Sequence, residues 1–222
     1  MEDIEYGKDC AFAFKDHTKI CKIFPDIINW KIKNIDYSER IERTKKSKIY
    51  NEIIKKANDF ITKQNIKLEE ITSWIDSMYL INRVFNHEDL NKEIKKRNSI
   101  IQEYIIPYTK DNRADMIICK DNKLVIIEFT YEKSHYISKA QQCFVYKVIL
   151  KQQLNNKIEC YSYIFSYTNE ESESKTGELK LEEQIEDLIR FLNTNLTDNN
   201  AYESLQLITH KNKYEWYNFD TN

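Results

Sequence analysis

Two short apolar runs joined by a polar turn constrain the fold of this 222-residue chain more than any other feature. Met116–Cys119 is entirely apolar, and Leu124–Tyr131 is rich in β-branched and aromatic residues, which favour strands. Between them, Lys120–Lys123 has the composition of a turn. Because neither run alternates between apolar and polar residues, we expect a β-hairpin whose strands are buried on both faces.

Apolar residues recur at helical spacing on both sides of this hairpin. Ahead of it, the spacing predicts helices over residues 44–65, 68–86 and 88–106, the last of them ended by Pro107. After it, the pattern predicts helix 134–154, strand 158–167, an acidic loop, helix 179–195 and a strand pair within 204–219. The first 37 residues fit no element, although their isoleucines and aromatics indicate that they are packed down. The fold class is therefore α/β (α+β), with a mixed sheet flanked by helices.

The charge of the chain is unevenly distributed, although its net value is only −2. Residues 40–67 hold 9 basic and 3 acidic side chains, and residues 132–157 hold 5 lysines and 1 glutamate. Residues 169–191 instead hold 8 acidic and 3 basic side chains. This asymmetry permits a basic face that binds phosphate, and solvated helices explain it equally well. The candidate phosphate-binding lysines are Lys45, Lys46 and Lys48.

The sequence shows no run of 18 apolar residues and begins with an acidic segment, so we expect no membrane partner. Its five cysteines are scattered and form no C-x-x-C motif, which favours reduced thiols in an intracellular, cytoplasmic or nuclear, protein. Cys10, His17 and Cys21 offer three zinc ligands, whereas a structural zinc site needs four. We therefore interpret them as buried residues and do not expect zinc.

Two acidic residues lie within the predicted strands, where acids are rare. Asp115 opens the first run, and Glu128 is flanked by Ile127 and Phe129. An ionised carboxylate in a buried strand is costly unless a partner or a metal compensates it. If the hairpin turns at 120–123, both acids lie toward the same open end of the sheet, where they suit Mg²⁺ or Mn²⁺. The alternatives are a turn or capping role for Asp115 and a solvent-facing edge position for Glu128.

A resemblance to a known family rests on these same strands. Arg113-Ala114-Asp115-Met116-Ile117-Ile118 and Glu128-Phe129-Thr130, with twelve residues between the two acids, resemble the PD…(D/E)xK nuclease core. More narrowly, they resemble the restriction-like endonuclease domain of site-specific non-LTR retrotransposons. That domain has an (R/K)PD strand, a (D/E)VT-type strand and a helix that bears Lys and Tyr. Ala114 replaces the family proline and Thr130 replaces the triplet lysine, and the resemblance covers about residues 92–150.

The resemblance implies a restriction-endonuclease-like core over residues 91–222, preceded by an N-terminal helical extension at residues 1–90. It also implies that Asp115 and Glu128 hold Mg²⁺ or Mn²⁺ and that a lysine positions the attacking water. Lys139 is the best candidate for this lysine, one helical turn before the position where the family lysine is expected. Nucleic-acid contacts are implied by an Arg-His-Asn-like motif and a Q-x-x-x-Y element, at Arg97, Asn98, Gln142 and Tyr146.

Three functional interpretations remain open at this point. The resemblance implies a nucleic-acid-binding protein derived from a metal-dependent endonuclease, which cleaves phosphodiester bonds with Mg²⁺ if the displaced lysine still serves. The alternative is a catalytically lapsed nuclease-like domain that binds structured RNA or a ribonucleoprotein, as a ribosome-associated factor does. A protein-interaction module is the third interpretation, because a net charge near zero gives no bulk attraction to DNA or RNA.

Overall fold

A single mixed sheet organises the described part of the chain, which in this computed structural model comprises residues 4–5, 9–32, 37–96, 98–131, 135–167 and 176–197. Six strands follow one another in the order β1-β2-β3-β4-β5-β6. Neighbours are antiparallel except β5 and β6, which are parallel. The strands are β1 (Ile4–Glu5), β2 (Phe12–Phe14), β3 (Ser99–Ile105), β4 (Arg113–Lys120), β5 (Lys123–Thr130) and β6 (Glu159–Ser166).

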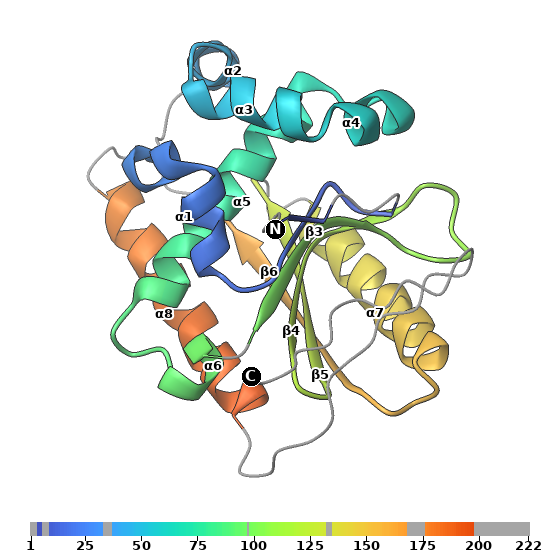
Figure 1. The fold of residues 1–222 in the computed structure, drawn as a ribbon. Coiled ribbons are helices and arrows are strands. Elements are labelled where there is room, and N and C mark those ends of the chain that lie inside the picture. The colour runs from blue at the N-terminus through green and yellow to red at the C-terminus, as the bar shows by residue number, and fades with distance from the viewer. Residues whose placement is uncertain are drawn as a thin grey trace.

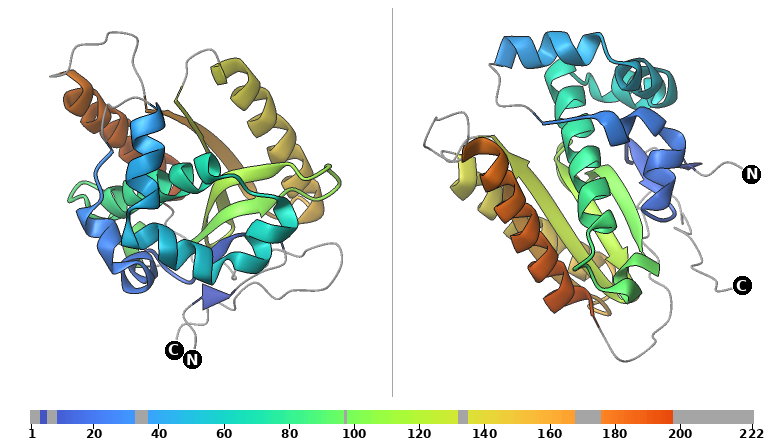
Figure 2. Two further views of the ribbon diagram at one scale, coloured as in Figure 1. Left: turned by 90° about the horizontal axis from the view of Figure 1, so that it is seen from above. Right: turned by 90° about the vertical axis from the view of Figure 1, so that its left-hand side faces the viewer.

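Helices cover both faces of this sheet (Figure 1). Helix α7 (Tyr136–Gln153) packs on one face, and α5 (Leu68–Asn86) and α8 (Thr176–Leu196) pack on the other. Three helices lie together at one end of the molecule (Figures 1 and 2): α2 (Tyr37–Lys45), α3 (Lys48–Lys56) and α4 (Asn58–Gln64). The remaining short elements are α1 (Thr18–Ile23), the 3₁₀ helix η1 (Pro25–Asn29) and α6 (Lys92–Lys96). The predicted fold class, a mixed sheet flanked by helices, is confirmed.

The predicted hairpin forms β4 and β5. It turns at Asp121, whose backbone is left-handed with φ 51°, and Asn122. Ile118 and Val125 enter the core cluster beneath α5 and α8, whereas Ile117 and Ile126 enter the cluster beneath α7. Burial on both faces explains why neither strand shows the alternation of a half-exposed sheet.

The prediction of a helix over 88–106 is wrong. Among the described residues of this range only Lys92–Lys96 is helical, and Ser99–Ile105 forms β3, which pairs with β2 and β4. Strand β3 is also buried on both faces, so its isoleucines do not alternate with polar residues. Ile101 and Ile105 are four residues apart, which is also a helical spacing. The misassignment follows from this coincidence, which periodicity alone does not resolve.

The helix predicted over 44–65 is divided into three. Ser47 is the N-cap of α3, and its hydroxyl accepts a hydrogen bond from the backbone N–H of Tyr50. Ala57, at φ −106° and ψ 14°, separates α3 from α4. The apolar spacing persists across the break at Ala57 because Ile49, Ile53 and Phe60 all enter one core.

The remaining predictions agree with the structure where it describes the chain. Helix 68–86 is α5 to the residue, and helices 134–154 and 179–195 correspond to α7 and α8. Strand 158–167 corresponds to β6. The predicted strand pair within 204–219 lies outside the described residues.

The N-terminal segment is part of the core, as its apolar residues indicated. Phe12 and Phe24 are fully buried, with ring centroids 5.2 Å apart, and β2 pairs with β3. The division placed at residue 90 therefore runs through a shared sheet and a shared core. In the described ranges, no helix is both long and apolar enough to cross a membrane. All five cysteines are free thiols.

We predict a strong contrast between two truncations in this segment. Phe24→Ala removes a fully buried ring, so it should lower the free energy of unfolding by about 3–5 kcal/mol. Ile28→Ala alters a side chain that is 61% exposed, so this variant should change the free energy of unfolding by less than about 0.5 kcal/mol. Urea unfolding of both variants measures the difference. Equal, small effects would contradict a core that includes residues 11–30.

Candidate functional site

The two strand acids lie side by side where strands β4 and β5 separate. At this end of the sheet the last backbone pair between β4 and β5 is Met116 with Ile127. Asp115 and Glu128 lie one residue beyond this pair. There the carboxylates accept the backbone hydrogen bonds. The Asp115 N–H donates to Glu128 Oε1 at 3.2 Å, and the Phe129 N–H donates to Asp115 Oδ2 at 2.8 Å. This exchange gives both acids a partner inside a buried sheet.

Lys139 of α7 completes the arrangement. Its Nζ lies 2.9 Å from Asp115 Oδ2 and 2.7 Å from Glu128 Oε2. The Glu128 side chain has no exposed surface, whereas 26% of the Asp115 and 22% of the Lys139 side chain is exposed. The strands and the following helix therefore bring the three proposed catalytic residues together at one point, to which solvent has partial access through Asp115 and Lys139.

The electrostatics of this triad are unbalanced. Burial, and then the charge of Asp115, raise the pKa of Glu128 to about 8, although Lys139 acts in the opposite direction. Burial alone would lower the pKa of Lys139, but the two carboxylates outweigh it and hold the pKa above its ordinary value. One ammonium group therefore compensates two neighbouring carboxylates only in part.

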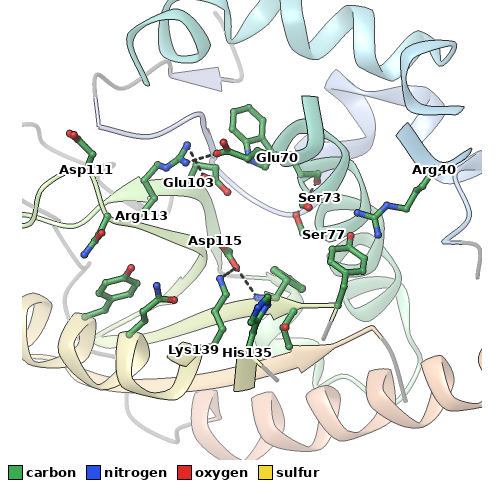
Figure 3. Close-up of a pocket in the computed structure, with 17 residues that line it drawn as sticks. Arg40, Glu70, Ser73, Ser77, Glu103, Asp111, Arg113, Asp115, His135 and Lys139 are labelled. Carbon is green, nitrogen blue, oxygen red and sulfur yellow. Dashed lines mark hydrogen bonds and ion pairs between the residues drawn. The ribbon is translucent and has the colours of Figure 1, made fainter. Parts of the chain in front are cut away.

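A pocket of about 490 Å³ opens over the triad, between α5 and α7 (Figure 3). Gln142 and Tyr146, which the resemblance singled out, line it together with Lys139. Gln142 is exposed, whereas Tyr146 is buried. Ser73 and Ser77 of α5 form part of the opposite wall. The pocket is thus built from strand ends and from helices on both faces of the sheet.

A third buried acid, missed from sequence, lies beside this pair. Glu103 of β3 falls opposite Asp115, between the pairs Gln102–Met116 and Tyr104–Ala114. Its backbone is left-handed at φ 56°, which is costly for any residue with a side chain inside a strand. Burial, and then Asp115, raise the pKa of Glu103 well above its ordinary value. The acids of β3, β4 and β5 therefore form a row across three strands.

Arg113 connects this row of acids to helix α5 through contacts with Glu103 and Glu70. One of its guanidinium nitrogens forms a hydrogen bond with Glu70 of α5, and the other lies 3.3 Å from Glu103 Oε2 (Figure 3). Glu70 and Glu103 escaped sequence analysis for different reasons. Glu70 lies on an ordinary helix, and Glu103 lay in the segment predicted to be helical. An acid within the run from Ile100 to Ile106 would have been conspicuous had the segment been assigned as a strand.

The far side of the pocket is tied to the N-terminal helices by a buried aspartate. Asp76 accepts hydrogen bonds of 2.7 Å from Trp30 Nε1 and from the Tyr131 hydroxyl. Arg40 of α2 lies 3.8 Å from Asp76 and stacks over the Tyr131 ring at 3.8 Å. Because Arg40 and Tyr131 both line the pocket, residues far apart in sequence form one wall.

Among the other candidates from the sequence, those that the structure describes lie away from the pocket lining. The buried Asn98 side chain accepts a hydrogen bond from the His17 N–H and donates to the Ile94 and Lys95 carbonyls, so it joins the N-terminal segment to α6. Arg97 lies outside the described residues. Three exposed lysines lie at the junction of α2 and α3: Lys45, Lys46 and Lys48.

Comparison with known proteins gives no relative: no protein-family model matches the chain, and no curated protein matches it.

The pocket presents two carboxylates, Asp115 and Glu128, that could contribute ligands to a hard divalent cation. Within the described ranges, no group of three or more His, Cys, Asp and Glu side chains is arranged to hold a metal ion. Mg²⁺ nevertheless binds commonly through one or two carboxylates, and waters and substrate phosphates complete its shell. With all groups ionised, five acids and three bases give the pocket and its floor a formal charge of −2. They are Glu70, Glu103, Asp111, Asp115, Glu128, Arg40, Arg113 and Lys139.

The raised pKa of Glu128 predicts a pH effect on stability. Between the ordinary carboxyl value of about 4.5 and the folded value of about 8, the folded state keeps a proton that the unfolded state releases. Stability relative to Glu128→Gln should therefore fall as pH rises from 5 to 8. Urea unfolding across this range measures the difference, with Asp111→Asn, an exposed acid at the pocket, as the control. Parallel profiles for wild type and Glu128→Gln would contradict the raised pKa.

Proposed function

We propose that this protein is a metal-dependent nuclease that hydrolyses phosphodiester bonds in nucleic acid. One observation carries the proposal. Two carboxylates on adjacent strands and a lysine on the following helix converge at the floor of a pocket, with Nζ–O distances of 2.7 and 2.9 Å. The nuclease family that the sequence resembles has the same order of chemical groups along the chain. The proposal therefore includes a restriction-endonuclease-like core and an origin in a retrotransposon-type endonuclease.

The residues divide the chemistry among them. Asp115 and Glu128 would hold Mg²⁺ or Mn²⁺, and the bound ion would activate water and stabilise charge on the phosphate. Lys139, a protonated ammonium group beside both carboxylates, would hold the attacking water and offset negative charge that develops on the phosphate oxygens. Gln142 and Tyr146 line the same pocket and would contact the substrate.

The position of Lys139 supports its role although the sequence motif is displaced. Thr130 occupies the third position of the triplet that begins at Glu128, where the broader family has lysine. Helix α7 instead places the Lys139 ammonium group against both carboxylates. This contact supports the proposal that a lysine one turn from the expected position serves in its place, because a lysine side chain is long and flexible.

The surroundings support a phosphate-bearing substrate inside the cell. The carboxylates at the pocket floor repel phosphate to the extent that they are ionised, and a bound cation would offset this repulsion. The exposed lysines at the α2–α3 junction supply attraction outside the pocket. Five free cysteines fit a reducing compartment, so we expect the protein in the cytoplasm or the nucleus.

The proposal predicts metal-dependent cleavage that fails when any triad member is lost. Glu128→Gln, Asp115→Asn and Lys139→Met should each reduce Mg²⁺- or Mn²⁺-dependent cleavage by about 100-fold or more. Lys147→Met, eight residues further along α7 and outside the pocket lining, should cleave at close to the wild-type rate. Cleavage of labelled single- and double-stranded DNA and RNA is followed on gels, with circular dichroism as the folding control. Undiminished cleavage by Glu128→Gln would overturn the proposal.

A second candidate is a nuclease-like domain that binds structured RNA or a ribonucleoprotein without cleaving it. The Lys139 ammonium group favours it, because it lies against both carboxylates and meets part of the need for a metal ion. Buried ion triads of this kind also occur as purely structural features. This candidate predicts binding that Glu128→Gln leaves intact, with no cleavage in any metal.

Both candidates predict salt-sensitive binding through the exposed lysines. Reversal of Lys45, Lys46 and Lys48 to Glu should weaken nucleic-acid binding and reduce the slope of log affinity against log salt by about 2–3. Reversal of three other exposed lysines is the matched control because it changes the charge equally: Lys15, Lys22 and Lys92. Fluorescence anisotropy at several salt concentrations measures both. Unchanged affinity in the triple variant would show that the α2–α3 junction does not contact nucleic acid.

A further inference from the structure

The loop between β3 and β4 presents an aromatic side chain to solvent beside the pocket. Tyr108 is 78% exposed, the largest exposed fraction among the large hydrophobic side chains of the described residues. Asp111 and Asn112, in the same loop, line the pocket. Consecutive Cα atoms lie 3.8 Å apart, so the Tyr108 Cα lies within about 11 Å of that of Asp111.

Hydrogen bonds hold the loop backbone on both sides of Tyr108. The Ile106 N–H donates to the Asn112 carbonyl at 2.8 Å and closes the base of the loop. The Thr109 hydroxyl donates to the Ile106 carbonyl at 2.7 Å, and Pro107 is buried. Tyr108 therefore projects from a tip whose backbone is anchored on both sides, so ordering of the backbone adds little to the cost when a ligand packs on the ring.

The backbone of this tip is strained. Tyr108 has φ 61°, in the left-handed region that bulky residues avoid, and Asp111 has the same value. A glycine or asparagine would adopt this conformation at lower cost, and a polar residue would suit solvent better than a phenol ring. Strained positions gather at ligand-binding sites, and here the strain displays an aromatic face next to a candidate nuclease pocket.

We propose that Tyr108 is a base-stacking residue that gives this site a preference for unpaired nucleotides. The inference rests on the proposed nuclease function. A base inside a duplex has both faces covered by its neighbours, whereas an unpaired base offers a free face to an exposed aromatic ring. Asp111 and Arg113 lie on the side of the pocket away from Arg40 (Figure 3), whose helix α2 ends at Lys45. A nucleic-acid strand that crosses the pocket would thus meet the loop that carries Tyr108 on one side and Arg40 on the other.

Binding measurements test this role directly. Fluorescence anisotropy compares a labelled single-stranded oligonucleotide with a blunt duplex of the same sequence, with Ca²⁺ in place of Mg²⁺ and strand integrity checked on gels. Tyr108→Ala should bind the single strand about 5- to 100-fold more weakly, with little change for the duplex. Tyr108→Trp should retain the affinity because it keeps an aromatic face. Phe144→Ala, a truncation of a 66% exposed ring on α7, should match wild type.

Two results would overturn the inference: wild-type affinity of Tyr108→Ala for the single strand, or an equal loss on strand and duplex. Absence of single-strand binding by the wild-type protein would overturn it as well. Hydrolysis of bis(p-nitrophenyl) phosphate, a phosphodiester without a base, separates the two proposals. Wild type and Tyr108→Ala should hydrolyse it equally. If neither hydrolyses it with any metal, the nuclease proposal fails, while the stacking comparison still decides the role of Tyr108 in binding.

Discussion

The contact of one ammonium group with two strand carboxylates is the constraint on which the rest of the site depends. Asp115 and Glu128 lie where buried strands would ordinarily carry apolar residues, and each accepts a backbone N–H that the ladder would otherwise have bonded. Lys139 then supplies part of the missing charge. Because a buried carboxylate is costly without such partners, the two strands and α7 must be aligned for the sheet end to be stable at all.

The helices on the other face of the sheet give this pair of acids a pocket. Helix α5 contributes one wall, and its Asp76 fixes Trp30 and Tyr131 in place from opposite directions. The N-terminal helices are therefore part of the site's architecture, because Arg40 reaches the pocket from α2. Removal of the first 90 residues would expose both the sheet face and the open end of the triad.

Sequence patterns predicted those parts of the structure in which local preference and burial agree. The hairpin, α5, α7, α8 and β6 have unambiguous periods or strand-forming runs, so their positions followed from the chain alone. Strand β3 did not, because a strand buried on both faces has no alternation, and its isoleucines also fit a helix. That error hid Glu103. The break at Ala57 was missed because one apolar face continues from α3 into α4.

The same limits explain which site residues could be predicted. Asp115 and Glu128 were conspicuous as acids among apolar neighbours. Lys139 was predicted from the family resemblance, and helix α7 brings its ammonium group to the two acids. Asn98 matched a motif in sequence, yet its amide is used to hold His17 and the end of α6. Arg113 contacts both Glu70 and Glu103, and no local sequence pattern reveals these contacts between distant segments.

The central claim is that Asp115 and Glu128 together form a site for a divalent cation. Electron paramagnetic resonance of Mn²⁺ tests it most directly, because the signal of the free ion falls as protein binds it. The account predicts one Mn²⁺ per wild-type chain and none for Asp115→Asn, provided that the variant remains folded. Retained Mn²⁺ binding by Asp115→Asn, or no binding by wild type at millimolar Mn²⁺, would contradict the account.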